Sequence, residues 1–95
     1  VYVGSHDGKL YAVDAATGRK RWSFTTGHGV FSSPAVADGV VYVASFDKNL
    51  YAVDAATGRK RWSFTTGDIV YSSPAVADGV VYVGSNDKNL YAIMA

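Results

Sequence analysis

Short apolar runs, separated by polar turn residues, divide the chain into candidate β-strands. Between residues 33 and 66 these runs cover 33–37, 40–44, 50–54 and 59–66. The first three runs are apolar on both faces, which is typical of a sheet packed between two neighbours. The fourth run alternates, with Trp62 and Phe64 on one side and charged or hydroxyl side chains on the other. No segment predicts a helix.

Turn chemistry joins these runs into an up-and-down sheet. Asp38-Gly39 matches a two-residue type I′ hairpin turn, which needs a positive φ at both central positions. Residues 45–49 form a polar loop, and residues 55–58 reverse the chain again. Pro34 stands at the start of its strand, where the missing N–H does least harm. The pattern therefore predicts four antiparallel strands in sequence order.

This pattern recurs with a period of 40 residues. The tripeptide Val-Tyr-Val occurs at residues 1–3, 41–43 and 81–83 (81 − 41 = 40). A period of about 40 residues that contains only strands is typical of β-propeller blades with four strands each. We predict an all-β fold of such blades, about two and a half of them, in one partial propeller over residues 1–95. Its repeats are 1–40, 41–80 and a truncated 81–95.

Composition excludes several kinds of partner. A net charge of +1 gives no field that favours nucleic acid or an anionic membrane. The absence of cysteine rules out disulfides and thiolate metal sites. No apolar run approaches the roughly 20 residues that a membrane helix needs. We therefore expect no nucleic-acid partner and no membrane span.

The repeated motifs resemble the PQQ-like β-propeller repeat family over the whole chain. They are Val-Tyr-Val-Gly-Ser, Leu-Tyr-Ala-Val-Asp-Ala-Ala-Thr-Gly, Trp-Ser-Phe-Thr-Thr-Gly and Ser-Ser-Pro-Ala-Val. The resemblance implies a tryptophan docking motif, Ala-x-Asp-x-x-Thr-Gly-x-x-x-Trp, that joins neighbouring blades. The blade-docking residues that match it are Asp14, Gly18, Trp22, Asp54, Gly58 and Trp62. The third repeat departs from the motif, because Met94 stands where the aspartate would be.

The same resemblance raises the question of a cofactor, because the family includes quinoprotein dehydrogenases. Their site needs Ca²⁺ ligands, a general base and a vicinal disulfide that caps the quinone. This chain has no cysteine, and nearly all its aspartates recur at equivalent turn positions. We expect no cofactor, no metal site and no catalytic residue, as in the scaffold and sensor members of the family. Those members favour a periplasmic or extracellular location. The open alternatives are a fragment of a quinoprotein-like dehydrogenase, and a designed or amplified repeat protein with no evolved function.

Three other residue groups have simpler interpretations. His6 and His28 lack a third ligand at a convincing spacing, which favours solvated loop histidines over a metal site. Alternation places Arg21 and Trp22 on opposite faces of a strand, so they form no platform for nucleic acid. The Ser32-Ser33 pair shows neither a general base nor an oxyanion hole beside it, and indicates a turn that enters a strand.

A position-by-position comparison of one repeat with the next shows which residues vary. Most of these positions lie in two groups. One group is the loop 45–49, its entry and its equivalents, and the other is the connection between one repeat's last strand and the next repeat's first. Ile93 and Met94, in the third repeat, differ outside these groups. Up-and-down topology brings both groups to one end of the blades, while the recurring turns share the opposite end. Since binding usually lies in loops on a rigid scaffold, we predict a ligand or partner face there. Its residues are His6, His28, Phe31, Phe46, Asp68, Ile69, Tyr71 and Asn86. Drift at tolerant loop positions is the alternative.

The strand count predicts that this chain needs partners. A propeller closes with about 4–8 blades, and terminal repeats need a neighbour to cover them. The partners are further blades of a longer chain or other copies of itself, with a protein or small ligand on the variable face. A ring of copies would duplicate two strands at each seam, which favours the longer array. The near-identity of the repeats implies recent amplification or deliberate design.

Overall fold

The computed structural model describes all 95 residues, and strands and loops alone make up the fold, as the sequence predicts. The ten strands are β1 (Tyr2–Gly4), β2 (Lys9–Val13), β3 (Lys20–Thr25), β4 (Ala35–Ala37), β5 (Val40–Ala44), β6 (Asn49–Asp54), β7 (Lys60–Thr65), β8 (Ala75–Ala77), β9 (Val80–Gly84) and β10 (Leu90–Met94). The structure contains no helix that could span a membrane.

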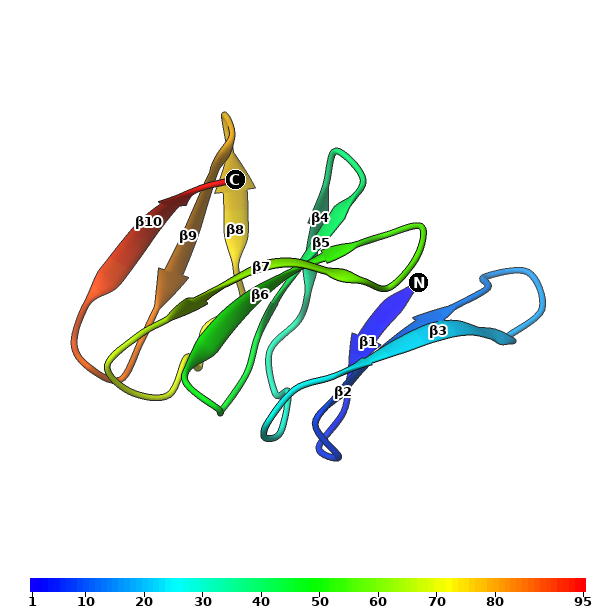
Figure 1. The fold of residues 1–95 in the computed structure, drawn as a ribbon, viewed down its shortest axis with the longest axis horizontal. Coiled ribbons are helices and arrows are strands. Elements are labelled where there is room, and N and C mark those ends of the chain that lie inside the picture. Colours follow the sequence, from blue (N-terminus) through cyan, green and yellow to red (C-terminus); the bar gives the residue numbers. More distant parts are fainter.

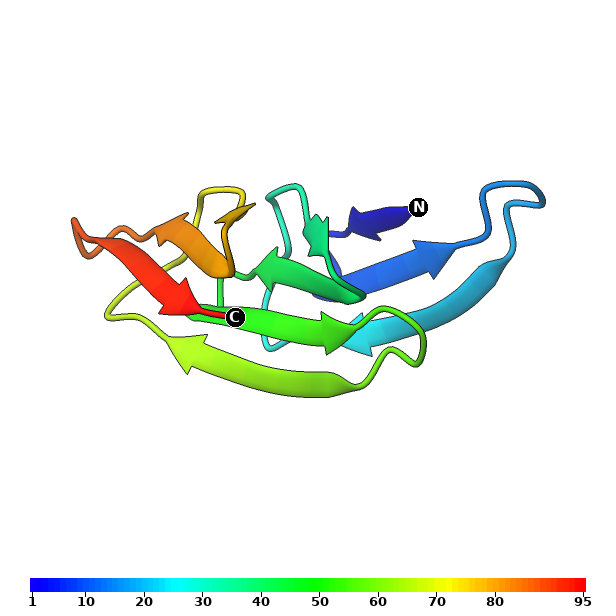
Figure 2. The same cartoon turned by 90° about the horizontal axis from the view of Figure 1, so that it is seen from above.

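The strands form three antiparallel sheets that follow one another along the chain (Figure 1). The orders are β1-β2-β3, then β4-β5-β6-β7, then β10-β9-β8. Figure 2 shows the outer strands β3 and β7 along one side of the molecule and the short strands β4 and β8 along the other. The prediction of partial propeller blades around one complete four-stranded blade is therefore confirmed.

The predicted turns have the expected geometry, while β4 is two residues shorter than its pattern and the bounds of β6 and β7 differ from theirs by one residue. Asp38 and Gly39 have φ values of 50° and 76°, so both central positions of the β4–β5 turn are left-handed. Strand β4 begins at Ala35 rather than at residue 33. Pro34 has no N–H to donate, and the Ser33 N–H donates instead to Ser73 Oγ of the next repeat at 3.0 Å.

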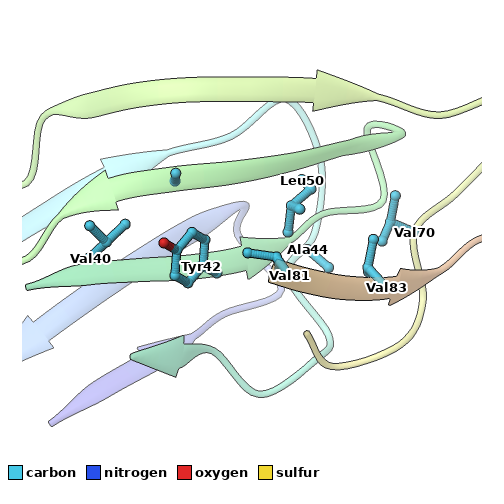
Figure 3. Close-up of a cluster of buried hydrophobic side chains, with 8 residues drawn as sticks. Val40, Tyr42, Ala44, Leu50, Val70, Val81 and Val83 are labelled. Carbon is cyan, nitrogen blue, oxygen red and sulfur yellow. The ribbon is translucent and has the colours of Figure 1, made fainter. Parts of the chain in front are cut away.

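The core lies between the sheets. Strand β5 is buried at every position, because the first and third sheets cover its two faces. Figure 3 shows the second junction, where Tyr42 and Leu50 of the middle sheet meet Val81 and Val83 of the third. In the outer strand β7, Trp62 and the other inward positions are half-buried while the alternate positions are exposed. These burial patterns explain why only the outer strand alternates in the sequence.

Candidate binding face and repeat junctions

Loops of two kinds gather at one end of the sheets (Figure 1). One kind follows the second strand of each blade, as between β5 and β6, and the other connects successive sheets, as between β3 and β4. We call this end the loop face and the opposite end, which carries the turns 38–39 and 55–58, the turn face. All eight residues that the sequence nominates for binding lie in loops of the loop face.

Four of these eight residues form a continuous aromatic cluster. The ring centroids of His6 and Phe31 lie 4.2 Å apart, and those of Phe31 and Phe46 lie 4.3 Å apart. The His28 ring lies 6.4 Å from that of Phe46. Phe31 remains 45% exposed, so the cluster presents apolar surface to solvent. The aromatic cluster thus joins loops of the first and second blades.

The other four residues lie at the second junction without forming such a cluster. A Cβ at Gly29 would lie 2.4 Å from the Phe31 ring, so this glycine allows the ring to lie against the backbone. The equivalent residue at the second junction is Ile69, which has a side chain. Tyr71 is 54% exposed. Asp68 accepts a hydrogen bond from the Ile69 N–H at 2.7 Å, and Asn86 donates its N–H to the Ile69 carbonyl at 2.9 Å.

Beneath the variable side chains, hydroxyl groups that recur in each repeat connect the blades. Ser45 Oγ donates to Thr26 Oγ1 at 3.0 Å, and Thr26 Oγ1 in turn donates to the His28 carbonyl at 2.6 Å. Both side chains are buried. At the second junction, the hydroxyls of Thr66 and Ser85 share a hydrogen bond of 3.1 Å. Buried polar groups that are fully paired add specificity to a core.

A carboxylate clamp forms a second connection at the loop face. Asp47 accepts hydrogen bonds from the Gly27 N–H of the preceding connection at 2.8 Å, from the Asn49 N–H at 3.0 Å, and from the Tyr51 hydroxyl. Asp87 accepts the same set from Gly67, Asn89 and Tyr91. Sequence reasoning missed this clamp, because aspartates that recur in loops resemble ordinary turn residues.

The first repeat retains only the local half of the clamp. Asp7 accepts the Tyr11 hydroxyl at 2.7 Å and the Lys9 N–H at 3.1 Å. The hydrogen bond from Tyr11 lowers the pKa of Asp7, and that from Tyr91 lowers the pKa of Asp87. Burial, together with the bond to Asp47, raises the pKa of Tyr51 to about 12. Folding therefore favours the aspartate anion and the neutral tyrosine.

The turn face makes a different contact between blades. Trp22 Nε1 donates to the Ala55 carbonyl of the next blade at 3.0 Å. Gly58 has a φ of 77°, and a Cβ there would lie 2.7 Å from the Trp22 ring. Only glycine suits this position, on conformational and steric grounds. Asp54 Oδ1 shapes the turn by accepting the N–H groups of Ala56 and Thr57, as Asp14 does one repeat earlier.

In the second blade, Trp62 occupies the equivalent of Trp22. It is half-buried beside Tyr42, with the ring centroids 6.0 Å apart. The third repeat reaches only Ala95, whose N–H donates to the Gly79 carbonyl at 2.9 Å, as the Ala55 N–H does to Gly39. Within residues 1–95 the structure therefore shows the indole hydrogen bond of Trp22 and none of this kind for Trp62.

The carboxylates do not fit a calcium-bound quinone. Asp14 and Asp54 use their oxygens on backbone N–H groups, and Asp47 and Asp87 use theirs in the clamp. No three side chains of histidine, cysteine, aspartate or glutamate come together. A Ca²⁺ ion prefers six to eight oxygen ligands, and this chain offers no convergent set of that kind.

The profile of a family described as "Outer membrane protein assembly factor BamB" matches residues 1–95. BamB from Moraxella catarrhalis is 25% identical in sequence, with a TM-score of 0.87 over 99% of this chain and 30% of that one. The quinohemoprotein alcohol dehydrogenase ADHIIG from Pseudomonas putida HK5 is 30% identical, with a TM-score of 0.81 over 90% of this chain and 15% of that one.

The fold also occurs in a computationally designed protein, Ika8. It is 18% identical, with a TM-score of 0.87 over 99% of this chain and 30% of that one. This chain therefore spans less than a third of the length of each of these three solved structures. No curated protein sequence matches the chain.

Proposed function

Because the chain belongs to the family of the outer membrane protein assembly factor BamB, we propose that it is a non-catalytic scaffold segment of a β-propeller. It binds a protein partner through the loop face. The observation that carries this proposal is the exposed aromatic cluster of His6, Phe31, Phe46 and His28, held on loops that the clamp and the paired hydroxyls position. Aromatic residues on a rigid scaffold are typical anchors of protein interfaces.

The chemistry of the cluster suggests the kind of protein that it binds. Its phenylalanine rings offer apolar surface, and the exposed imidazoles of His6 and His28 add polar atoms beside them. Outer-membrane barrel strands alternate apolar and polar residues and carry girdles of aromatic side chains. An unassembled strand of this kind would pack its aromatic residues against the cluster. A periplasmic location follows from this proposal.

We propose that the turn face provides blade docking. The supporting contacts are the Trp22 indole bond to Ala55 and the close fit of its ring over Gly58. Asp54 and Asp14 act indirectly, by holding their turns in shape. Trp62 would dock in the same way on the turn of a following blade, so further blades are among the expected partners.

A direct test measures the binding of a denatured outer-membrane barrel protein, labelled and diluted from urea, by fluorescence anisotropy. Replacing both Phe31 and Phe46 with alanine should weaken binding at least tenfold, because it removes the apolar anchors. Val36→Ala is the matched control, since Val36 is an exposed apolar side chain in β4, outside the loop face. Equal affinity of the double variant and the wild type would contradict the proposal.

The dehydrogenase alternative rests on the 30% identity to the quinohemoprotein alcohol dehydrogenase. Adding PQQ and Ca²⁺ to this chain tests it through the absorbance spectrum of the quinone. Our proposal expects a spectrum identical to that of free PQQ, because the carboxylates are engaged elsewhere. A saturable spectral shift would favour the alternative. A protein without evolved function would show no specific binding in either experiment.

A further inference from the structure

Basic side chains gather on the outer strands β3 and β7, close to the turn face. Six of the nine lysine and arginine residues lie there, and all six are exposed. They form two identical tripeptides, which we call the first and the second basic cluster: Arg19, Lys20 and Arg21 in the first blade, and Arg59, Lys60 and Arg61 in the second. The net charge of +1 conceals this concentration of positive charge.

A β-bulge in each outer strand brings two of the cations to the same side. In the second blade, Ala52 pairs with Trp62. The next residue, Val53, pairs with Lys60, so that Arg61 is an extra residue. Strict alternation would place Lys60 on the half-buried side with Trp62. The bulge moves Lys60 to the opposite side, where Arg61 lies, because paired residues share one side of a sheet. The same register shift occurs in the first blade.

The nearby carboxylates do not neutralise the basic clusters. Asp54 Oδ1 accepts the N–H groups of its own turn, and Asp14 Oδ1 does the same one repeat earlier. The segments 14–21 and 54–61 each contain three cations and one aspartate, which gives each a charge of +2 (3 − 1 = 2). The other three lysines share the loop face with four aspartates. Positive charge is therefore concentrated on the outer strands.

Neighbouring blades leave the basic clusters uncovered. The first cluster is exposed although the second blade packs against its sheet, and the second cluster is exposed although the first blade packs against its sheet. The connections between blades, residues 26–34 and 66–74, run through the loop face, so the path of the chain does not cross the outer strands (Figure 2). Strand β7 is also the last of its sheet, so the backbone groups on its outer side have no strand to pair with. Further blades of this kind would leave the clusters open to a separate molecule.

The residues around each cluster indicate the kind of anion that it binds. Arginine pairs with a carboxylate through two parallel hydrogen bonds. Ser63 and Thr65 are exposed further along β7, on the same side as Arg61. An edge strand of this kind accepts an extended chain through backbone hydrogen bonds. Binding to a lipid surface combines basic with apolar side chains, and none of the exposed large apolar residues lies in β3 or β7. These features favour an extended polypeptide.

We propose that each basic cluster binds an acidic, extended segment of a partner protein, which lies along the outer strand with its carboxylates against the arginine and lysine side chains. This inference goes beyond the proposed function, because it concerns the outer strands and not the loop face. Residues 10–27 recur unchanged as residues 50–67, so the two sites are identical. The chain should therefore bind two such segments with equal affinity, and a partner that carries both gains avidity.

Isothermal titration calorimetry with a short capped peptide, in which glutamate alternates with threonine, tests the inference. The matched peptide has glutamine in place of glutamate, so it keeps the backbone and loses the charge. The wild type should bind two glutamate peptides per chain, and it should bind the glutamine peptide at least tenfold more weakly. Added salt should weaken binding of the glutamate peptide, because exposed charges are screened.

Glutamine variants of the clusters separate the two sites. Changing every residue of the second basic cluster to glutamine should reduce the stoichiometry from two peptides to one and leave the affinity of the remaining site unchanged. Changing both clusters should abolish binding. The matched control, Lys9→Gln with Lys48→Gln and Lys88→Gln, removes three charges from the loop face and should still bind two peptides. Since the cluster residues are exposed, their variants should melt like the wild type by circular dichroism.

Several results would overturn the inference. They are a wild type that does not bind the glutamate peptide, equal affinity for the glutamine peptide, and a second-cluster variant that still binds two peptides. Tighter binding of phosphatidylglycerol vesicles or of a single-stranded oligonucleotide than of the peptide, lost when both clusters are changed, would assign the clusters to a different partner. The variant of both clusters should bind a denatured barrel protein like the wild type, because its loop face is unchanged.

Discussion

The turn face and the loop face join the same blades by different means. At the turn face the Trp22 indole donates a hydrogen bond to the next blade, and its ring lies so close to Gly58 that a side chain there would collide with it. At the loop face, the blades are joined by recurring groups: backbone amides, paired hydroxyls and the Asp47 carboxylate. Side chains can therefore vary at the loop face while its connections persist.

This difference explains where the repeats diverge. Residue 28 is histidine and residue 68 is aspartate, yet each side chain accepts a hydrogen bond from the N–H of the next residue, at 2.8 Å and 2.7 Å. The carbonyls of both residues accept hydroxyl hydrogen bonds at their junctions. Variation at the loop face thus changes the exposed side chains and leaves the junction intact.

The largest effect that we expect comes from the turn face. Trp22→Ala removes a half-buried indole and its bond to Ala55, and it should lower the free energy of unfolding by about 3 kcal/mol. In the 95-residue chain Trp62→Ala should cost less, because the structure gives the Trp62 indole its packing beside Tyr42 but no hydrogen bond like that of Trp22. Urea denaturation followed by circular dichroism measures both. Equal losses would mean that the docking contact contributes little.

A smaller loss should follow from breaking the loop-face clamp. Asp47→Ala leaves the Gly27 and Asn49 N–H groups and the Tyr51 hydroxyl without their acceptor, which should cost about 2 kcal/mol. The matched variant is Asp7→Ala, which breaks only contacts within its own repeat. The same denaturation experiment should show the smaller loss for Asp7→Ala. Equal losses for the two variants would mean that the hydrogen bond from the Gly27 N–H to Asp47 contributes nothing to the stability of the junction.

The clamp should also make stability depend on pH at both extremes. The folded pKa values of Asp7 and Asp87 are lowered, so their contribution is present above the usual aspartate pKa and is lost as the pH falls through the folded values. The folded pKa of Tyr51 is raised to about 12, so its contribution is present below about pH 10 and is lost as the pH rises toward 12. Urea midpoints across pH 2–12 should show a plateau with losses at both ends. Tyr51→Phe should lessen the alkaline loss.

The smallest effect concerns one backbone position of the loop face. Lys48 has a φ of 78°, a left-handed conformation that costs a non-glycine residue about 1–2 kcal/mol. Lys48→Gly relieves this cost but loses some chain entropy, so it should stabilise the protein by about 0.5 kcal/mol. Gly8→Ala, at the equivalent position, should destabilise, because its Cβ would lie 2.9 Å from the His28 carbonyl oxygen. Thermal melts of the two variants should therefore shift in opposite directions.

Much of the fold could be predicted from the sequence, because its signals are local and repeated. Asp38-Gly39 specifies its own turn, and a strand such as 40–44 that is apolar at every position requires a neighbour on each face. The repeat then supplies the order of the strands. The largest difference is at the beginning of β4, where the Ser33 N–H pairs with the next repeat rather than within its own sheet. The bounds of β6 and β7 differ from the predicted ones by one residue.

The contacts at the loop face could not be predicted in the same way. Comparison of the repeats places Phe31 and Phe46 at one end of the blades. The contact between their rings, however, requires a residue without a side chain at position 29, and glycine meets this need. The clamp was missed because Asp47 has the form of a turn residue, and its partner Gly27 is 20 residues away. The signal that the sequence offered was the recurrence of Thr26 and Ser45 as Thr66 and Ser85. The structure shows why they recur: these hydroxyl residues are buried, and buried polar groups need partners.

Amide hydrogen exchange at the loop face tests the central claim most directly, which is that variable loops cover a fixed junction between blades. The informative N–H groups are those of Gly27 and Phe46 at the first junction and of Gly67 and Asn86 at the second. We expect all four to be protected as strongly as the ladder amides of β5. Exchange at the rate of unprotected loop amides, while β5 stays protected, would contradict the account.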